Sequence, residues 1–162
     1  MSINSSMFSS ASGDWCTPIE IVSLVHSIDP IGLDPCSNEH SLVGAKTSWT
    51  IKDDGLTKRW AGNGLVYVNP PYGREIEKWV QKCCLEALTG VEIVALLPAR
   101  VDTRWFQSFA RNAEEVLFYR GRIRFLGAPN SAPFPSVFCY WGKRPEQFRK
   151  AFEGKGIVAK WT

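Results

Sequence analysis

Residues 64–73 read Gly-Leu-Val-Tyr-Val-Asn-Pro-Pro-Tyr-Gly, and this stretch decides the fold class. Residues 64–68 are rich in β-branched and aromatic side chains, which is typical of a buried strand. The strand must end at Asn69, because two consecutive prolines lack the backbone N–H groups that a sheet ladder needs. Apolar residues with helical spacing then follow from about residue 74 to residue 88. The stretch therefore predicts a strand, a rigid turn and a helix in succession.

The same alternation continues on both sides of this stretch. Upstream, residues 17–20 predict a helix start with Thr17 as the N-cap, and a short strand follows at 31–34. Downstream, Asp102 is predicted to cap a helix that carries Trp105. Further strands are predicted near residue 49 and at 91–97, 115–119 and 136–141. This order predicts a compact α/β fold, with a mostly parallel sheet and one antiparallel strand near the C-terminus.

Composition indicates one domain in a reducing compartment. The 162 residues fit a single domain at 14–162, and the Ser-rich residues 1–13 predict a disordered tail. No apolar run reaches the length of a membrane span, so we expect no membrane partner. The five cysteines and two histidines lack metal-ligand spacing, so we also expect no metal. We expect a cytoplasmic protein, in the bacterial host cytoplasm if it is phage-encoded. A homo-oligomer is compatible with the sequence.

Charge is distributed unevenly along the chain. Residues 1–97 contain 7 Lys and Arg against 11 Asp and Glu, whereas residues 98–162 contain 12 against 5. A basic half beside an acidic half favours a polyanionic partner for the C-terminal half.

The tetrapeptide Asn69-Pro70-Pro71-Tyr72 carries the chemistry that the sequence suggests. Aromatic exocyclic amines are poor nucleophiles, because the nitrogen lone pair is delocalised into the ring. Two acceptors aimed at the two N–H bonds draw the lone pair back, and the Asn69 oxygen and the Pro70 carbonyl fit this role. The prolines hold that carbonyl rigidly, and Tyr72 offers a face on which a flipped base can stack.

This motif resembles that of the amino-methyltransferases, and the chain as a whole is similar to the phage-type DNA N-6-adenine methyltransferase family. The resemblance rests on the order of several segments, at residues 14–18, 33–35, 53–56, 69–73, 97–100, 102–106, 121–125 and 132–136. It implies a Rossmann-like fold, S-adenosylmethionine as the methyl donor, and the N6 amine of adenine in DNA as the acceptor.

The resemblance also implies which residues bind the cofactor. They are Trp15, Thr17, Asp34, Pro35, Asp54 and Asn69. The chain departs from many methyltransferases in lacking their Gly-rich loop, since Gly62 and Gly64 precede their strand rather than follow it. The methionine end of the cofactor must therefore be held in another way.

Basic and aromatic residues of the C-terminal half are the candidates for DNA contact, since phosphates need cations and bases need stacking faces. Arg120, Arg122 and Arg124 share one face if that segment is extended. The full candidate set comprises Arg100, Arg104, Trp105, Arg120, Arg122, Arg124, Phe125 and Phe134.

Three alternative functions stay open at the level of sequence. The dipeptide Pro35-Cys36 is similar to the Pro-Cys nucleophile of cytosine-C5 methyltransferases, which attack the base with a thiolate. The Asn-Pro-Pro-Tyr motif also fits other planar nitrogens, in RNA adenine, cytosine N4 or a protein glutamine. The third alternative is a DNA-binding module without catalysis.

Overall fold

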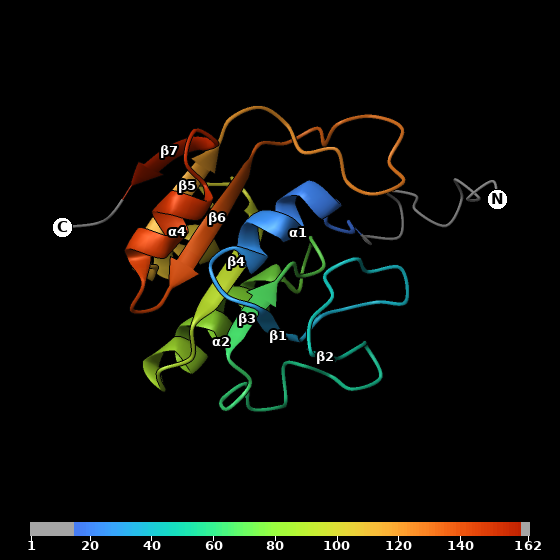
Figure 1. Ribbon diagram of the computed structural model, residues 1–162, viewed down its shortest axis with the longest axis vertical. Helices are drawn as coiled ribbons and strands as arrows, with labels where there is room; N and C mark the ends of the chain where they lie inside the picture. Colours follow the sequence, from blue (N-terminus) through green and yellow to red (C-terminus); the bar gives the residue numbers. More distant parts are fainter. Residues whose placement is uncertain (1–14, 160–162) are drawn as a thin grey trace.

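The computed structural model describes residues 15–159, which form one mixed sheet with helices on both faces (Figure 1). The predicted tail at residues 1–13 lies outside the described residues. The helices are α1 (Ile19–His26), α2 (Ile76–Leu88), α3 (Arg104–Ser108) and α4 (Pro145–Ala151), and a 3₁₀ turn, η3, lies at Ala110–Asn112. The strands are β1 (Ile31–Asp34), β2 (Thr47–Ser48), β3 (Leu65–Val68), β4 (Ile93–Pro98), β5 (Glu115–Tyr119), β6 (Ser136–Trp141) and β7 (Gly156–Ala159).

The strand order is β2-β1-β3-β4-β6-β5-β7. Strands β2, β1, β3 and β4 are parallel, which puts their carboxyl ends at one edge of the sheet. The antiparallel strand predicted near the C-terminus is confirmed as β6, which pairs with both β4 and β5. However, β7 is also antiparallel to β5, so the sheet is mixed, with a parallel half and an antiparallel half. The segment that forms α4 and β7 was not predicted, and this is why the sheet is less parallel than expected.

Two hydrophobic clusters cover the two faces of the sheet. Helices α1 and α4 pack on one face, and α2 and α3 pack on the other (Figure 1). The residues of β3 alternate between these clusters, because successive side chains of a strand point to opposite faces. Val66 and Val68 face α2, whereas Leu65 and Tyr67 face α1, and all four are buried. This burial on both faces explains why the strand reads as a continuous apolar run.

Two predicted helix caps are wrong. Thr17 does not cap α1, because its hydroxyl lies against Tyr67, and the residue before the helix is Pro18, whose side chain makes no cap. Helix α3 is capped by Thr103 instead of Asp102, with the Thr103 side chain accepting from the Phe106 N–H. Between residues 15 and 159, no helix has the length and apolar character needed to cross a bilayer.

Candidate functional site

A cavity of about 920 Å³ lies at the carboxyl ends of the parallel strands. It is lined by residues that follow β1 and β3, by the segment before α1, and by the long connection after β2. This is where open α/β sheets bind ligands. Eight of the residues predicted from the sequence line it together: Trp15, Thr17, Asp34, Pro35, Asp54, Asn69, Pro70 and Pro71.

The Asn69 side chain is fixed in one orientation. Its amide nitrogen Nδ2 donates to the Trp15 carbonyl and, at 3.2 Å, to the Thr17 hydroxyl. Both N–H bonds are thus used within the protein, and the amide cannot rotate without losing them. The oxygen Oδ1 is buried and has no hydrogen-bond partner among residues 15–159. A buried acceptor without a donor costs about 1–3 kcal/mol, so a ligand N–H that reached it would recover free energy.

Thr17 links this amide to a tyrosine that the sequence analysis did not select. The Thr17 hydroxyl is 2.7 Å from the hydroxyl of Tyr67, and both residues are buried. Burial raises the pKa of Tyr67 far above its usual range, so this hydroxyl keeps its proton. The sequence could have pointed to Tyr67, because residues 67 and 69 are two apart in extended backbone and therefore share a face.

The Asp34 carboxyl ends β1 and faces the same cavity. It is only 4% exposed, and burial raises its pKa to about 6, against partial compensation by hydrogen bonds from Ser37, the Cys36 backbone and Ser41. A carboxylate with so little solvation favours a cationic ligand, because a nearby positive charge replaces the stabilisation that water gives to an exposed carboxylate.

Cys36 does not have the properties of a nucleophile. Burial raises the pKa of its thiol well above the usual range, and the neighbouring Asp34 carboxylate raises it further. The thiol therefore stays protonated at neutral pH, whereas attack on a base requires the thiolate. This argues against the Pro-Cys alternative.

The connection after β2 approaches the end of β1 closely. A Cβ on Gly55 would lie 2.0 Å from the Pro35 carbonyl oxygen, so only glycine fits there. The Trp60 indole N–H donates to the Gly55 carbonyl at 2.9 Å and anchors this turn. Asp54 precedes Gly55 with a φ of 52°, in the left-handed region, and is exposed at the cavity. Backbone packing therefore places Asp54 beside Asp34-Pro35.

Acidic residues outnumber basic ones around the cavity. Sequence reasoning identified two of the carboxylates that line it and missed two others, which come from a loop and from the start of α2. The acidic lining residues are Asp34, Glu39, Asp54 and Glu75, and Lys52 is the one basic residue among the lining residues described. Such a wall attracts a cation at neutral pH.

Four aromatic rings close one side of the site. Tyr72 does not line the cavity; it is half-buried, and its hydroxyl makes a long 3.4 Å hydrogen bond to the Leu96 carbonyl. Its ring meets Phe134 edge-on at 5.4 Å and Phe125 at 6.4 Å. Trp15 contacts the same two phenylalanines at 5.2 and 5.5 Å. Residues from the motif turn, the N-terminal segment and the β5–β6 connection therefore meet at one point.

Comparison with known proteins agrees with this geometry. Residues 4–136 match the family model described as DNA N-6-adenine-methyltransferase (Dam). The chain belongs to the DNA N-6-adenine-methyltransferase family.

Two members of this family from phages give the scale of the similarity. A DNA N-6-adenine-methyltransferase of Escherichia phage T1 is 31% identical over 106 residues, which are 64% of this chain and 43% of that protein. A DNA N-6-adenine-methyltransferase of Haemophilus phage HP1 is 29% identical over 115 residues, which are 69% of this chain and 65% of that protein. The matched part is thus less than two thirds of either relative.

Within this family member, two of the predicted DNA contacts are otherwise engaged. Trp105 is 7% exposed and packs in the core cluster under α2, where no base can reach its ring. Arg104 is exposed, but its guanidinium donates to both carboxylate oxygens of Glu77, at 2.9 and 3.1 Å. Neither residue therefore presents a free stacking face or a free cation.

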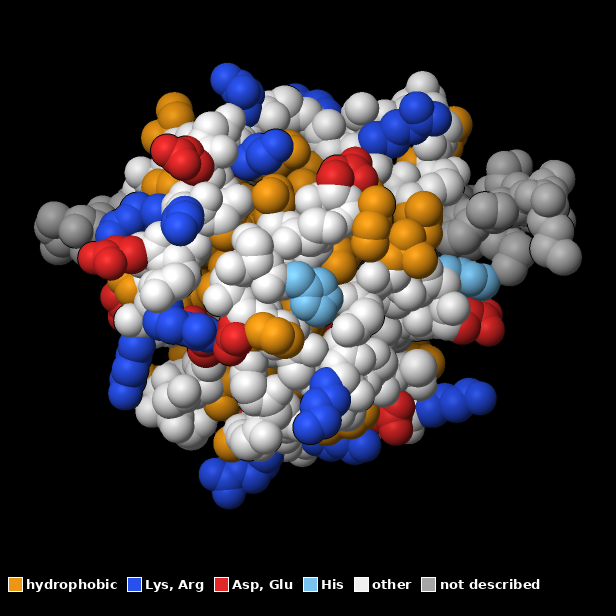
Figure 2. Space-filling view, viewed as in Figure 1, with side chains coloured by type: hydrophobic (Ala, Val, Ile, Leu, Met, Phe, Trp, Pro, Cys, Tyr) orange, Lys and Arg blue, Asp and Glu red, His pale blue; other side chains and the backbone are white. Residues whose placement is uncertain are grey.

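Of the other predicted arginines, Arg100 follows the end of β4, and the remaining three lie on the connection between β5 and β6, the orange loop of Figure 1. Arg120, Arg122 and Arg124 are exposed, but Gly121 turns the chain with a φ of 85°, so the three do not form one extended strand as predicted. Arg122 and Arg124 still alternate with buried neighbours and share an outer side. On the face shown in Figure 2, Lys and Arg side chains are scattered around the rim instead of forming one stripe.

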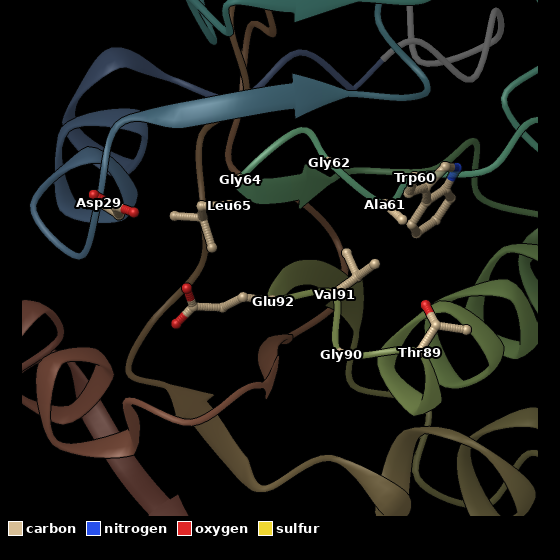
Figure 3. A pocket seen from close by; sticks show the side chains of 10 residues that line it. All are labelled: Asp29, Trp60, Ala61, Gly62, Gly64, Leu65, Thr89, Gly90, Val91 and Glu92. Atoms are coloured by element: carbon tan, nitrogen blue, oxygen red, sulfur yellow. The ribbon is translucent and has the colours of Figure 1, made fainter.

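A second, smaller cavity of about 320 Å³ lies at the opposite end of the sheet. Figure 3 shows that its residues come from the turns that lead into β1, β3 and β4, among them Asp29 and Glu92. Both carboxylates accept hydrogen bonds from Arg144, and Glu92 also accepts one from Tyr140. The charged groups at this end are thus paired with one another.

Proposed function

We propose that this chain transfers a methyl group from S-adenosylmethionine to the N6 amine of adenine in DNA, with the base rotated out of the duplex. The observation that carries the proposal is Asn69, whose two N–H bonds are used within the protein while its buried Oδ1 has no donor among residues 15–159. An exocyclic amine presents the N–H donor that this oxygen lacks.

The reaction needs two acceptors that act on one amine. Asn69 Oδ1 accepts from one N–H, and the Pro70 carbonyl accepts from the other. As the two hydrogen bonds form, electron density returns from the ring to the nitrogen, whose lone pair becomes nucleophilic. The nitrogen would form its bond to the methyl carbon as the bond between that carbon and the cofactor's sulfur breaks, which would leave S-adenosylhomocysteine. The nitrogen would then release one proton to solvent, and no residue of the chain would become covalently modified.

Tyr72 and the surrounding rings account for base binding. In the free protein Phe134 and Phe125 pack against Tyr72, so the base must enter among these rings. A flipped base then stacks on Tyr72, with the half-buried Phe134 covering its other face. Phe125, which the sequence analysis also named for this role, is only 2% exposed and packs beneath these rings. The hydroxyl of Tyr72 points to the Leu96 carbonyl and has no part in the chemistry that we propose.

The residues around the large cavity fit S-adenosylmethionine. When bound, this cofactor supplies a methyl group on a positively charged sulfur. The cavity volume lies in the range of sites for small ligands, and the acidic wall suits a ligand with two positive charges and one negative charge. We propose that Asp34 meets a cationic group, that Asp54 meets the adenine amine, and that Trp15, Thr17 and Pro35 complete the wall. No metal has a part in this scheme.

For DNA, we propose a contact surface built on the β5–β6 connection. Arg120, Arg122 and Arg124 would contact phosphates there, together with Arg100 at the end of β4. We leave Trp105 and Arg104 out of this surface, because one is buried and the other is paired. The parallel half of the sheet, with its site at the strand ends, also supports a Rossmann-like methyltransferase core within a single domain at 14–162.

Mass spectrometry of nucleosides tests the proposal directly. The chain is incubated with methyl-labelled S-adenosylmethionine and, separately, with duplex DNA, RNA and a glutamine-containing peptide. We expect the label in N6-methyladenine from DNA. Label in N4-methylcytosine, RNA or peptide would assign another planar nitrogen. Cofactor binding by calorimetry without transfer to any acceptor would indicate a non-catalytic DNA-binding module.

A further inference from the structure

Two buried hydroxyl groups, those of Thr17 and Tyr67, lie behind the Asn69 amide. The amide nitrogen donates to the Thr17 hydroxyl at 3.2 Å, and that hydroxyl lies 2.7 Å from the hydroxyl of Tyr67. Thr17 is 2% exposed and Tyr67 is fully buried. The contact between the two hydroxyls is thus buried, and the Tyr67 hydroxyl depends on Thr17 for its hydrogen bond among the described residues.

We infer that Tyr67 is a positioning residue for the proposed methyl transfer, acting through Thr17 to hold the Asn69 amide with Oδ1 directed at the substrate amine. This inference rests on the proposed function for its reaction, but its geometric part concerns Asn69 alone. Tyr67 does not line the cavity and touches neither substrate nor cofactor in this scheme.

The orientation of Asn69 needs such support because an amide has two nearly isosteric ends. Rotation by half a turn would put an NH₂ group where Oδ1 stands, and two donors would then face the amine. The Trp15 carbonyl accepts from one N–H, and Thr17 accepts from the other. The Tyr67 hydroxyl holds Thr17 in the rotamer that accepts. Loss of this hydroxyl frees Thr17 to turn away, and the amide then has one anchor instead of two.

Another tyrosine serves as a matched control. Tyr140 is fully buried on β6, in the same hydrophobic cluster as Tyr67, and its hydroxyl also makes a hydrogen bond, to the partly exposed Glu92. It lies at the amino end of the parallel strands, where Val94 is its partner in the sheet and Arg144 contacts its hydroxyl. Tyr140→Phe removes the same atom from the same core but leaves the Asn69 amide untouched.

The test compares Tyr67→Phe with Tyr140→Phe in the full chain. Single-turnover methylation of a duplex that contains adenine is measured together with cofactor affinity and melting temperature. We expect Tyr67→Phe to lower the rate roughly 10- to 100-fold, the range for a reacting group displaced by a fraction of an ångström. The affinity for S-adenosylmethionine should change less than the rate does, because Tyr67 does not line the cavity. Tyr140→Phe should lower the melting temperature without changing the rate.

A double-mutant comparison identifies the route of the effect. If Tyr67 acts through Asn69, Tyr67→Phe should add less than about twofold to the loss already caused by Asn69→Ala, since coupled residues are non-additive. The inference is overturned if Tyr67→Phe keeps the wild-type rate, or if it lowers the rate of the Asn69→Ala variant by the same factor as that of wild type.

A second readout does not depend on catalysis. The side-chain amide of Asn69 gives its own pair of ¹H–¹⁵N signals by nuclear magnetic resonance. Tyr67→Phe should shift and broaden this pair, and Tyr140→Phe should leave it unchanged. An unchanged pair in Tyr67→Phe would overturn the inference. If the wild-type chain methylated no DNA, the proposed function would fail, and these signals would still decide whether Tyr67 fixes the amide.

Discussion

The polar groups at the two ends of the sheet are satisfied to different degrees. At the amino ends of β1, β3 and β4, Arg144 pairs with both Asp29 and Glu92, and Tyr140 adds a hydrogen bond to Glu92. At the carboxyl ends, Asn69 Oδ1 has no donor among the described residues, and Asp34 is buried with no cationic partner in that part of the chain.

This contrast separates stability from function. A paired network lowers the free energy of the folded chain by itself, whereas an unpaired buried acceptor or a desolvated carboxylate raises it. The groups at the carboxyl ends therefore need a ligand to satisfy them, whereas the groups at the amino ends satisfy one another. Substitutions at the carboxyl ends should therefore lower the rate or the affinity without lowering the free energy of unfolding, whereas substitutions at the amino ends should lower the free energy of unfolding alone.

The largest effect should come from Asn69→Ala. Its acceptor acts most strongly when the amine nitrogen gains positive charge, so the loss falls on the transition state. We expect the single-turnover rate on adenine-containing duplex to fall ~100-fold or more, as for other preorganised polar contacts. Cofactor affinity by calorimetry should change little. A rate within tenfold of wild type would remove Asn69 from the chemistry.

Tyr72 should respond according to its ring and not its hydroxyl. Tyr72→Ala loses a stacking face worth roughly 1–3 kcal/mol per base, so the catalytic efficiency should fall by about that amount. Tyr72→Phe keeps the face and loses only a 3.4 Å hydrogen bond to Leu96, so most of the activity should remain. The same single-turnover assay compares the two. If Phe were as inactive as Ala, the hydroxyl would have a chemical role that this scheme lacks.

Asp34→Asn should weaken cofactor binding and stabilise the empty protein. A hydrogen bond to a charged group contributes about 1.5–3 kcal/mol, so the affinity for S-adenosylmethionine should fall by roughly one to two orders of magnitude. Calorimetry measures this loss. In the wild type the same affinity should weaken as pH falls below about 6, where the Asp34 carboxyl takes up a proton.

The stability effect of Asp34 has a defined sign. Burial raises its pKa from 3.8 to about 6, so the folded state binds this proton more tightly than the unfolded state does. Its contribution to stability is present below pH 4 and is lost as pH rises through 6. Above pH 6, Asp34→Asn should be more stable than wild type by at most about 3 kcal/mol, since each pKa unit corresponds to 1.36 kcal/mol. Urea unfolding at pH 4 and pH 7.5 checks this, and a difference independent of pH would contradict it.

Arg144→Ala should act at the other end and change stability alone. It leaves Glu92, whose side chain is 17% exposed, with only the Tyr140 hydrogen bond. Because the Arg144 side chain is 35% exposed, solvent screens part of the loss, and we expect about 1–2 kcal/mol less stability. The methylation rate per folded molecule should stay at the wild-type value. A slower rate at unchanged stability would refute the division between the two ends.

Local patterns predicted much of the framework of the fold and several of the residues that line the 920 Å³ cavity. Strands β5 and β6 have the predicted bounds, because runs such as residues 136–141 are apolar enough to be recognised without tertiary information. The residues near the end of β3 were also predictable, since parallel strands bring their carboxyl ends to one edge.

Non-local contacts were not predictable. Thr17 is in a typical capping position, yet its hydroxyl bonds to Tyr67, fifty residues away in the chain. The seven-residue helix α4 and the edge strand β7 were too short to give a clear period.

The smallest effect should separate free arginines from a paired one. Each phosphate contact contributes about 0.9 to the slope of log affinity against log salt concentration. Arg122 and Arg124 are exposed and have no ion pair among residues 15–159, so replacing both with Gln should reduce the slope by up to about 2.

Arg104→Gln is the control, because Glu77 already binds its guanidinium through two oxygens. The salt slope of Arg104→Gln should match that of wild type. Cofactor affinity should be the same in wild type, in the double variant and in Arg104→Gln. Fluorescence anisotropy of labelled duplex from 50 to 200 mM salt, roughly the range over which such contacts are resolved, measures the slopes. A loss of slope in Arg104→Gln equal to that of a single Arg122→Gln change would place α3, with its side of the sheet, on the DNA, and the β5–β6 connection would no longer be the distinct contact surface.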